Sequence, residues 1–288
     1  MNLDEVKRTI DKAVIDYLPE IEDEHKYIAE AMKYSLENGG KRIRPYLTLE
    51  FCRLCGGDPM KAIPFAVALE YIHTYSLIHD DLPCMDNDDM RRGKPSSHIK
   101  FGEANALLAG DALLTRAFGI VCMSPLPPAF KCYAVACLSE LAGAQGMIGG
   151  QYKDLKNEER ETDLVMLLDT DRLKTGALIK SACLLGCYAA DASEEEIEAA
   201  EVYAENLGIA FQIRDDILDV TATSEQLGKP AGSDVTNGKN TYVSVLGMED
   251  AGKAVFDYTS EAIDALEIFG DKNKDIIEFT NSLIGRQN

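Results

Sequence analysis

Apolar residues recur three and four positions apart through most of this 288-residue chain. That spacing lines up side chains on one face of an α-helix, and we find no convincing two-residue alternation of the kind that strands show. Proline supports the same interpretation, because all ten prolines except Pro230 lie between Pro19 and Pro128, leaving residues 129–229 without one. We predict an all-α fold in which residues 1–288 form a single large helical bundle around a central cavity.

The predicted helix over residues 62–80 carries polar residues on its apolar stripe. His73 and Asp80 fall on the same face as Phe65. Pro83 then stops or kinks the helix, because proline lacks a backbone donor and pushes the preceding residue out of helical geometry.

Three later segments mix polar and apolar residues in the same way. Segment 130–155 forms one stripe flanked by glycines 143, 146, 149 and 150, which favour a close helix contact or a ligand. The stripe of segment 164–182 turns polar at residues 172–175, and that of segment 204–219 ends in acids. Polar groups at core positions on several helices predict a charged cavity inside the bundle.

Two acidic clusters lie in these otherwise apolar stretches. The first contains Asp80, Asp81 and Asp86, and the second contains Asp215, Asp216 and Asp219. Asp215 and Asp219 are four residues apart and share a helix face, while the break at Pro83 lets Asp80 and Asp86 converge. Buried carboxylates need compensation, and hard divalent cations prefer oxygen ligands. The clusters therefore predict metal sites on two walls of one cavity.

Basic residues accompany the acids. Residues 39–45 place Lys41, Arg42 and Arg44 beside two glycines, and Arg91 and Arg92 follow the first acidic cluster directly. Arginine forks and lysine charges suit phosphate oxygens. Segment 225–241 reads as a loop that carries Lys229 and Lys239 after the second cluster.

The bulk composition narrows the class of partner. The formal net charge is −20, from 49 acidic and 29 basic residues. This balance disfavours nucleic acid and anionic membranes as partners, and it requires a metal or a local basic pocket to hold any anionic substrate. No apolar run approaches the ~18 residues of a membrane span. The acidic N-terminus does not resemble a secretory signal, and the eight cysteines fit buried positions in a reducing cytoplasm.

Together these motifs resemble those of the trans-isoprenyl diphosphate synthases, in that family's order from about residue 36 to about 245. The resemblance is to the short-chain bacterial farnesyl and geranylgeranyl diphosphate synthases in particular. The matching motifs are Gly39-Gly40-Lys41-Arg42-Ile43-Arg44-Pro45, Asp80-Asp81 with Asp86, Arg91-Arg92-Gly93, Gly150-Gln151, Lys174-Thr175-Gly176, and Phe211-Gln212 with Asp215, Asp216 and Asp219. The resemblance implies an isoprenoid synthase-like bundle, cytoplasmic and homodimeric, that uses several Mg²⁺ ions per active site.

It also implies a role for each motif residue. Asp80, Asp86, Asp215 and Asp219 would bind the Mg²⁺ that holds an allylic diphosphate, with Asp81 and Asp216 in the same clusters supporting the site. The same diphosphate would be gripped by Arg91, Lys174, Lys229 and Lys239. Isopentenyl diphosphate, bound without metal, would contact Lys41, Arg44, His73 and Arg92. Thr175 and Gln212 would stabilise the allylic carbocation that forms when the diphosphate leaves.

Product length is expected to depend on what blocks the cavity beneath Asp80. Ideal helix geometry puts Ser76 under Asp80 and Tyr75 to one side, so the choice of Tyr75 as the stop follows from the resemblance. A bulky aromatic residue five positions before the cluster is similar to farnesyl synthases, which predicts a fifteen-carbon product. Geranylgeranyl diphosphate synthase is the alternative.

Two other functions are compatible with parts of the sequence. An all-α metal phosphohydrolase would use the His79-Asp80 dyad but leaves the second acidic cluster unexplained. A non-catalytic prenyl diphosphate-binding subunit would be expected to lose acidic residues, and both clusters are intact.

Overall fold

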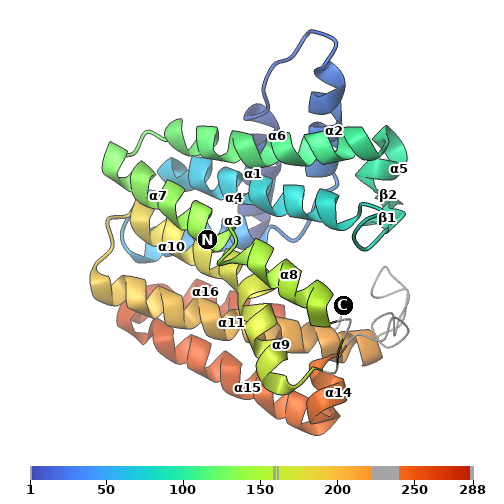
Figure 1. The fold of residues 1–288 in the computed structure, drawn as a ribbon. Helices are drawn as coiled ribbons and strands as arrows, with labels where there is room; N and C mark the ends of the chain where they lie inside the picture. Colours follow the sequence, from blue (N-terminus) through green and yellow to red (C-terminus); the bar gives the residue numbers. More distant parts are fainter. Residues whose placement is uncertain (1, 158–159, 161, 222–239, 286–288) are drawn as a thin grey trace.

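The computed structural model describes every residue except 1, 158–159, 161, 222–239 and 286–288. The described chain is mostly helical, as predicted, with its helices packed side by side (Figure 1). The helices are α1 (Leu3–Asp16), α2 (Lys26–Glu37), α3 (Ile43–Leu54), α4 (Pro59–Asp80), α5 (Ser97–Phe101), α6 (Glu103–Cys122), α7 (Pro128–Leu141), α8 (Met147–Asn157), α9 (Leu164–Asp171), η1 (Arg172–Gly176), α10 (Ala177–Ala189), α11 (Glu194–Thr221), α14 (Tyr242–Leu246), α15 (Met248–Asp264), η2 (Ala265–Asn273) and α16 (Lys274–Ile284).

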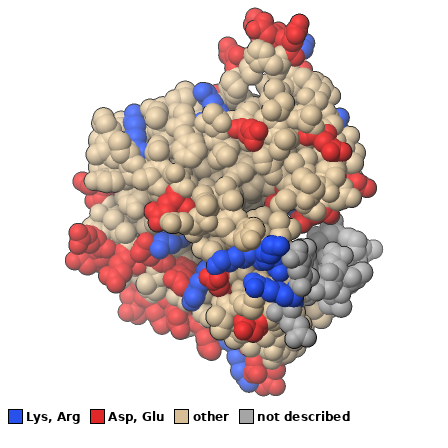
Figure 2. Space-filling model, viewed as in Figure 1, with Lys and Arg blue, Asp and Glu red and all other residues tan. Residues whose placement is uncertain are grey.

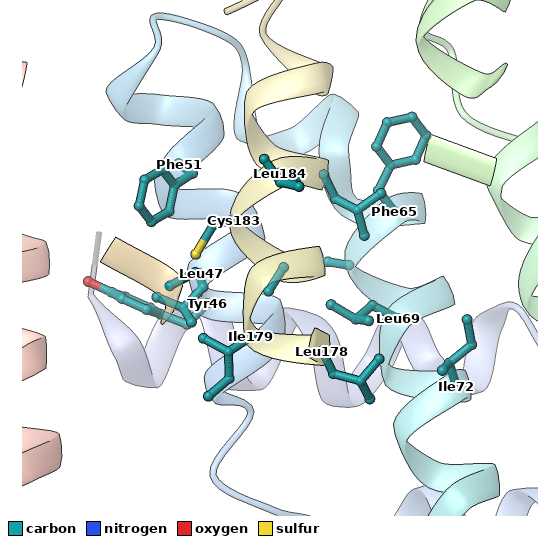
Figure 3. Close-up of a cluster of buried hydrophobic side chains, with 14 of the residues drawn as sticks. Tyr46, Leu47, Phe51, Phe65, Leu69, Ile72, Leu178, Ile179, Cys183 and Leu184 are labelled. Atoms are coloured by element: carbon teal, nitrogen blue, oxygen red, sulfur yellow. The ribbon is translucent and has the colours of Figure 1, made fainter. Parts of the chain in front are cut away.

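The core forms where α10 packs against both α3 and α4. Figure 3 shows Phe51 from α3, Phe65 and Leu69 from α4, and Leu178 and Cys183 from α10 in one cluster. Each of these side chains is almost completely buried. Burying a large apolar side chain contributes about 1.5–3 kcal/mol, so this cluster fixes α4 firmly in the bundle. The acidic end of α4 is thereby held at a defined place.

The beginning and end of α4 follow from its sequence. Asp58 caps the N-terminus by accepting a hydrogen bond from the backbone N–H of Met60, and Pro59 occupies the first turn, where its missing N–H costs nothing. The helix ends at Asp80, three residues before Pro83, as the sequence predicts. The C-terminal ends of α4 and α11, which carry the two acidic clusters, lie on the same side of the bundle (Figure 1).

One sequence prediction was wrong. The stripe over 130–155 is not one helix, because the chain turns at residues 142–146 between α7 and α8. Gly143 and Gly146 each donate to a carbonyl three residues earlier, which replaces helical bonding by tight turns. The described residues also contain a short antiparallel hairpin, β1 (Met90–Arg91) paired with β2 (Lys94–Pro95), which is compatible with the predicted all-α class. Two residues per strand are too few to show alternation, so the sequence could not reveal it.

Helix α6 is, among the described residues, the one helix long and apolar enough to cross a membrane by length and composition alone. A core helix of a folded protein passes the same test. Here α6 packs along α4, and it carries Glu103, Asp111 and Arg116. We interpret it as a bundle helix.

Candidate active site

A cavity of about 560 Å³ lies at the acidic end of α4. Charged or polar side chains and apolar ones share its wall, which confirms the prediction of a charged cavity inside the bundle. The lining residues are Arg44, His73, Tyr75, Ser76, Leu77, His79, Asp80, Met85, Asp111, Leu114, Met147, Ile148, Gln151, Tyr152, Leu155, Lys174, Thr175 and Leu178.

The first acidic cluster is folded around the end of α4. The backbone N–H of Asp86 donates to the carbonyl of Asp80 at 2.9 Å, so the turn that contains Pro83 brings these two residues together. Asp81 is only 2 % exposed and accepts a hydrogen bond from Nε of Arg91 at 2.9 Å. The hairpin that carries Arg91 is thereby tied to the end of the helix.

Asp80 is poised to change its charge. Burial, together with the neighbouring carboxylates of Asp86 and Asp81, raises its pKa to about 6, against the lowering effect of Lys174 and Arg91. A divalent cation would remove this repulsion, because it neutralises the carboxylates that crowd each other.

Lys174 enters the site from an irregular turn. Residues 172–176 form the π-helix η1 between α9 and α10, and such turns frequently occur at functional sites. Nζ of Lys174 donates to Asp154 at 2.5 Å. Gly150 of α8 lies against this turn, since a Cβ atom on it would come within 2.2 Å of the backbone nitrogen of Lys174. Gly150 thus serves a close helix contact, one of the two roles that the sequence suggested, whereas Gly143, Gly146 and Gly149 lie against backbone carbonyls at the end of α7 and in the turn before α8.

The second acidic cluster connects to this turn by a relay of hydrogen bonds. The Thr175 hydroxyl donates to Gln212 at 3.3 Å, and Nε2 of Gln212 donates to Asp216 at 3.3 Å. Asp216 also accepts from the backbone N–H of Tyr242 at 2.8 Å. Among the described residues the lining of the cavity includes Asp80 but no member of the second cluster. The two clusters are therefore linked through Lys174, Thr175 and Gln212.

The carboxylates fit Mg²⁺ only in an open arrangement. No three His, Cys, Asp or Glu side chains within the described ranges stand close enough to form a ready metal cage. Mg²⁺ does not need one, because it keeps several waters and is usually held by one or two carboxylates together with substrate phosphates. Burial first, and then the charges of Asp86 and Asp81, raise the pKa of Asp80, so a cation near this carboxylate would be stabilising. The residues present thus fit a metal that arrives with a diphosphate.

A positive pocket lies beside the acidic one. Burial lowers the pKa of Arg44 to about 10; Glu70 opposes this shift and Arg92 adds to it. Burial and the charges of Arg44 and Arg92 also lower the pKa of His73, which is therefore neutral at pH 7. Nε of Arg44 is buried, and no hydrogen-bond partner for it occurs in the part of the chain that the structure describes. An unpartnered, buried cationic donor suits an anionic group that carries no metal of its own.

Arg42 holds this pocket in shape. It is 3 % exposed and donates to Glu70 at 2.5 Å, to Asp11 at 2.8 Å and to the Leu36 carbonyl at 2.9 Å. All its bonds point into the protein, so its role is structural. Arg92 donates to the backbone carbonyl of Gly39. This bond joins the basic segment at Arg91 and Arg92 to the basic segment 39–45.

The remaining predicted residues divide into four groups. Asp215 and Asp219 lie on α11, where Asp215 is half-buried and Asp219 is 3 % exposed. Tyr75 and Ser76 line the cavity, and their role in product length stays a prediction. Lys41 is exposed just before α3. Lys229 and Lys239 lie outside the described residues.

Two acids near the site were missed by the sequence analysis. Asp154, which pairs with Lys174, follows Gln151 by three residues and so shares its helix face, a signal that could have been used. Asp171 lies beside the second cluster, and its pKa rises to about 7 through burial and through repulsion from Asp216 and Asp154. Its burial could not be foreseen from sequence.

Comparisons with known proteins match this geometry. The polyprenyl synthetase family model matches residues 25–276. The chain is 44% identical over 252 residues to a farnesyl diphosphate synthase of Geobacillus stearothermophilus, covering 86% of this chain and 84% of the relative. It is 43% identical over 282 residues to geranylgeranyl pyrophosphate synthase 4 of Arabidopsis thaliana, covering 96% of this chain and 75% of the relative.

Solved structures agree with the sequence relatives. The crystal structure of an FPP/GFPP synthase from Zymomonas mobilis in its apo form superposes with a TM-score of 0.88 at 35% identity, covering 98% of this chain and 97% of that one. The motifs, the fold and the relatives lead to one conclusion. The chain belongs to the polyprenyl synthetase family and is a prenyltransferase of the trans-prenyl diphosphate synthase type.

Proposed function

We propose that this protein is a farnesyl diphosphate synthase, which condenses isopentenyl diphosphate with dimethylallyl and then geranyl diphosphate. The observation that carries the proposal is Tyr75, an aromatic side chain only 5 % exposed that lines the cavity just over one helical turn before Asp80. A bulky residue at this depth limits the chain that the cavity can hold.

The acidic side of the site would hold the allylic diphosphate. Asp80 and Asp86, with Asp215 and Asp219, would hold Mg²⁺, which when bound supplies positive charge to the leaving diphosphate. Lys174 and Arg91 add donors to the same group once they exchange Asp154 and Asp81 for phosphate oxygens. Departure of the diphosphate leaves an allylic carbocation.

The basic side would hold isopentenyl diphosphate. Arg44, Arg92 and neutral His73 form a donor-rich pocket beside Asp80, and exposed Lys41 is a further donor. Held close and aligned, the double bond attacks the carbocation, and the proton that is lost passes to the released diphosphate. The hydrogen-bonded Thr175 and Gln212 would stabilise the cation, and the apolar part of the wall would exclude water that quenches it.

Incubation with isopentenyl and dimethylallyl diphosphates and Mg²⁺, followed by sizing of the products, tests the proposal. We expect a fifteen-carbon product and a longer one from Tyr75→Ala. Ile78→Ala serves as the matched control, because Ile78 lies on the same helix but outside the cavity lining. A wild-type twenty-carbon product would support the geranylgeranyl alternative. Hydrolysis without condensation would support a phosphohydrolase, and binding without turnover a non-catalytic subunit.

We also propose that the enzyme is a homodimer and works in the cytoplasm. Large apolar side chains are exposed on neighbouring helices, namely Leu107 and Leu108 of α6, Tyr133 of α7 and Ile148 of α8. Figure 2 shows that the surface over α6 and α7 carries few charges. Light scattering should give twice the chain mass, and Leu108→Glu should give monomers.

The cysteines support the proposed cytoplasmic location. All eight, which lie in the described part, are free, as in a reducing compartment.

A further inference from the structure

We propose that His79 is a positioning residue that fixes the ring of Tyr75 and so sets the depth of the cavity. The inference rests on the proposed function, in that Tyr75 limits the product. It adds a second determinant of chain length, which is held by the backbone of α6.

His79 and Tyr75 stand next to each other on the cavity wall. They are four residues apart on α4, and both line the cavity. Their rings meet edge to face, with 5.6 Å between centroids and 76° between planes. This is a favoured geometry for aromatic pairs, so the imidazole supports the phenol ring from the Asp80 side.

The imidazole is itself anchored from behind. Its Nε2 lies 3.0 Å from the backbone carbonyl of Leu107 in α6. A carbonyl can only accept, so Nε2 carries the proton and donates it. Asp111 of α6 stands 4.0 Å from the same nitrogen. The ring therefore has one defined orientation, set by α6.

Helix α6 makes room for this ring at Gly110. A Cβ atom built on Gly110 would come within 2.1 Å of Nε2 and 2.5 Å of Cδ2 of His79. Any other residue would push the imidazole away from α6. Since the ring also lines the cavity, the displacement would narrow the space next to Tyr75.

Tyr75 has no polar anchor among the described residues. Its hydroxyl is buried, and none of those residues forms a hydrogen bond with it. Its ring is therefore positioned by packing alone, and its contact with His79 matters more than it would for an anchored tyrosine.

The test uses two substitutions with opposite expected effects on the wild-type background. His79→Ala removes the support, so Tyr75 can rotate aside. We expect the ratio of twenty-carbon to fifteen-carbon product to rise about three- to tenfold. Gly110→Ala forces the imidazole inward, and we expect the ten-carbon intermediate to accumulate. His79→Phe keeps the ring without the donor and should stay closer to wild type than His79→Ala does.

Product ratios separate positioning from a general loss of structure. Ile78→Ala removes similar bulk from the residue next to His79, at a position outside the cavity lining, and should leave the ratio unchanged. If Tyr75→Ala lengthens the product and His79→Ala does not, the inference is overturned while the proposed function stands. If the wild type makes no fifteen-carbon product, the proposed function fails first. Equal shifts in Ile78→Ala and His79→Ala would also refute the inference.

Discussion

The two acidic clusters begin with the same pair of residues but are held in different ways. In each, the second aspartate is buried, at 2 % exposure for Asp81 and 7 % for Asp216. Asp81 binds a side chain, the guanidinium of Arg91 on the hairpin. Asp216 binds the backbone N–H of Tyr242 and the amide of Gln212.

This difference indicates which cluster can change its side-chain contacts when a diphosphate binds. A diphosphate can compete with Asp81 for Arg91, because phosphate oxygens and carboxylates bind guanidinium in the same way. The backbone N–H of Tyr242 is buried and uncharged, so a diphosphate competes for it less readily than for the Arg91 guanidinium. We infer that the first cluster rearranges when the allylic substrate binds, whereas the second is a fixed reference.

The largest expected effect comes from the first residue of each pair. Asp80→Asn and Asp215→Asn should each lower kcat by about 10²–10³-fold or more. Each substitution removes a carboxylate proposed to hold Mg²⁺, and the positive charge of that ion would stabilise the leaving diphosphate. Steady-state kinetics with Mg²⁺ measures the loss, and circular dichroism checks that the bundle stays folded. Parental turnover in either variant would refute a metal role for that cluster.

The second residue of each pair should distinguish the clusters. Asp81→Asn leaves the half-buried Arg91 in contact with water, so we expect about a tenfold fall in kcat/KM with little loss of stability. In Asp216→Asn a single side-chain carbonyl remains for two donors, the amide of Gln212 and the backbone N–H of Tyr242. We therefore expect the free energy of unfolding to fall by about 1–3 kcal/mol. Kinetics and urea unfolding of both variants measure these effects. The same pattern in both variants would contradict the comparison.

Asp154 should have a smaller effect, since it orients Lys174 without contacting substrate. Asp154→Asn weakens the 2.5 Å ion pair, and we expect KM for the allylic diphosphate to change about three- to tenfold. Lys153 is a matched site on the same helix, where its ion pair with Asp169 is largely exposed. Lys153→Met should leave KM unchanged, because exposed pairs contribute little.

The smallest effect is a pH dependence of stability in the metal-free protein. The folded-state pKa of Asp171 is raised to about 7 by burial, Asp216 and Asp154. A raised pKa means that stability is fully present below the ordinary carboxyl range and is lost as pH rises through about 7. We expect the Tm to fall by a few degrees more from pH 5 to pH 8 in the wild type than in Asp171→Asn. Equal slopes in the two proteins would show that Asp171 is not the source.

The sequence predicted the parts of the site that depend on short-range patterns, namely helical spacing, proline positions and clustered charges. The stripe with His73 and Asp80 on it, the helix end before Pro83 and the basic segment at Arg44 all lie as predicted. Local rules failed where bonding departs from a regular helix. The apolar spacing over 130–155 continues through the turn at Gly143, so it did not predict that turn. The sequence of residues 172–176 carries no pattern that predicts a π-helix.

The sequence by itself determined the helices, the two acid clusters and the cations beside them, because periodicity, proline and charge act over a few residues. Only the tertiary structure decided which groups meet. In the folded protein Lys174 pairs with Asp154, Arg42 binds Glu70 in a structural role, and the imidazole of His79 lies against Gly110. These contacts join residues that are tens of positions apart, and their energies depend on burial that exists only after the helices have packed.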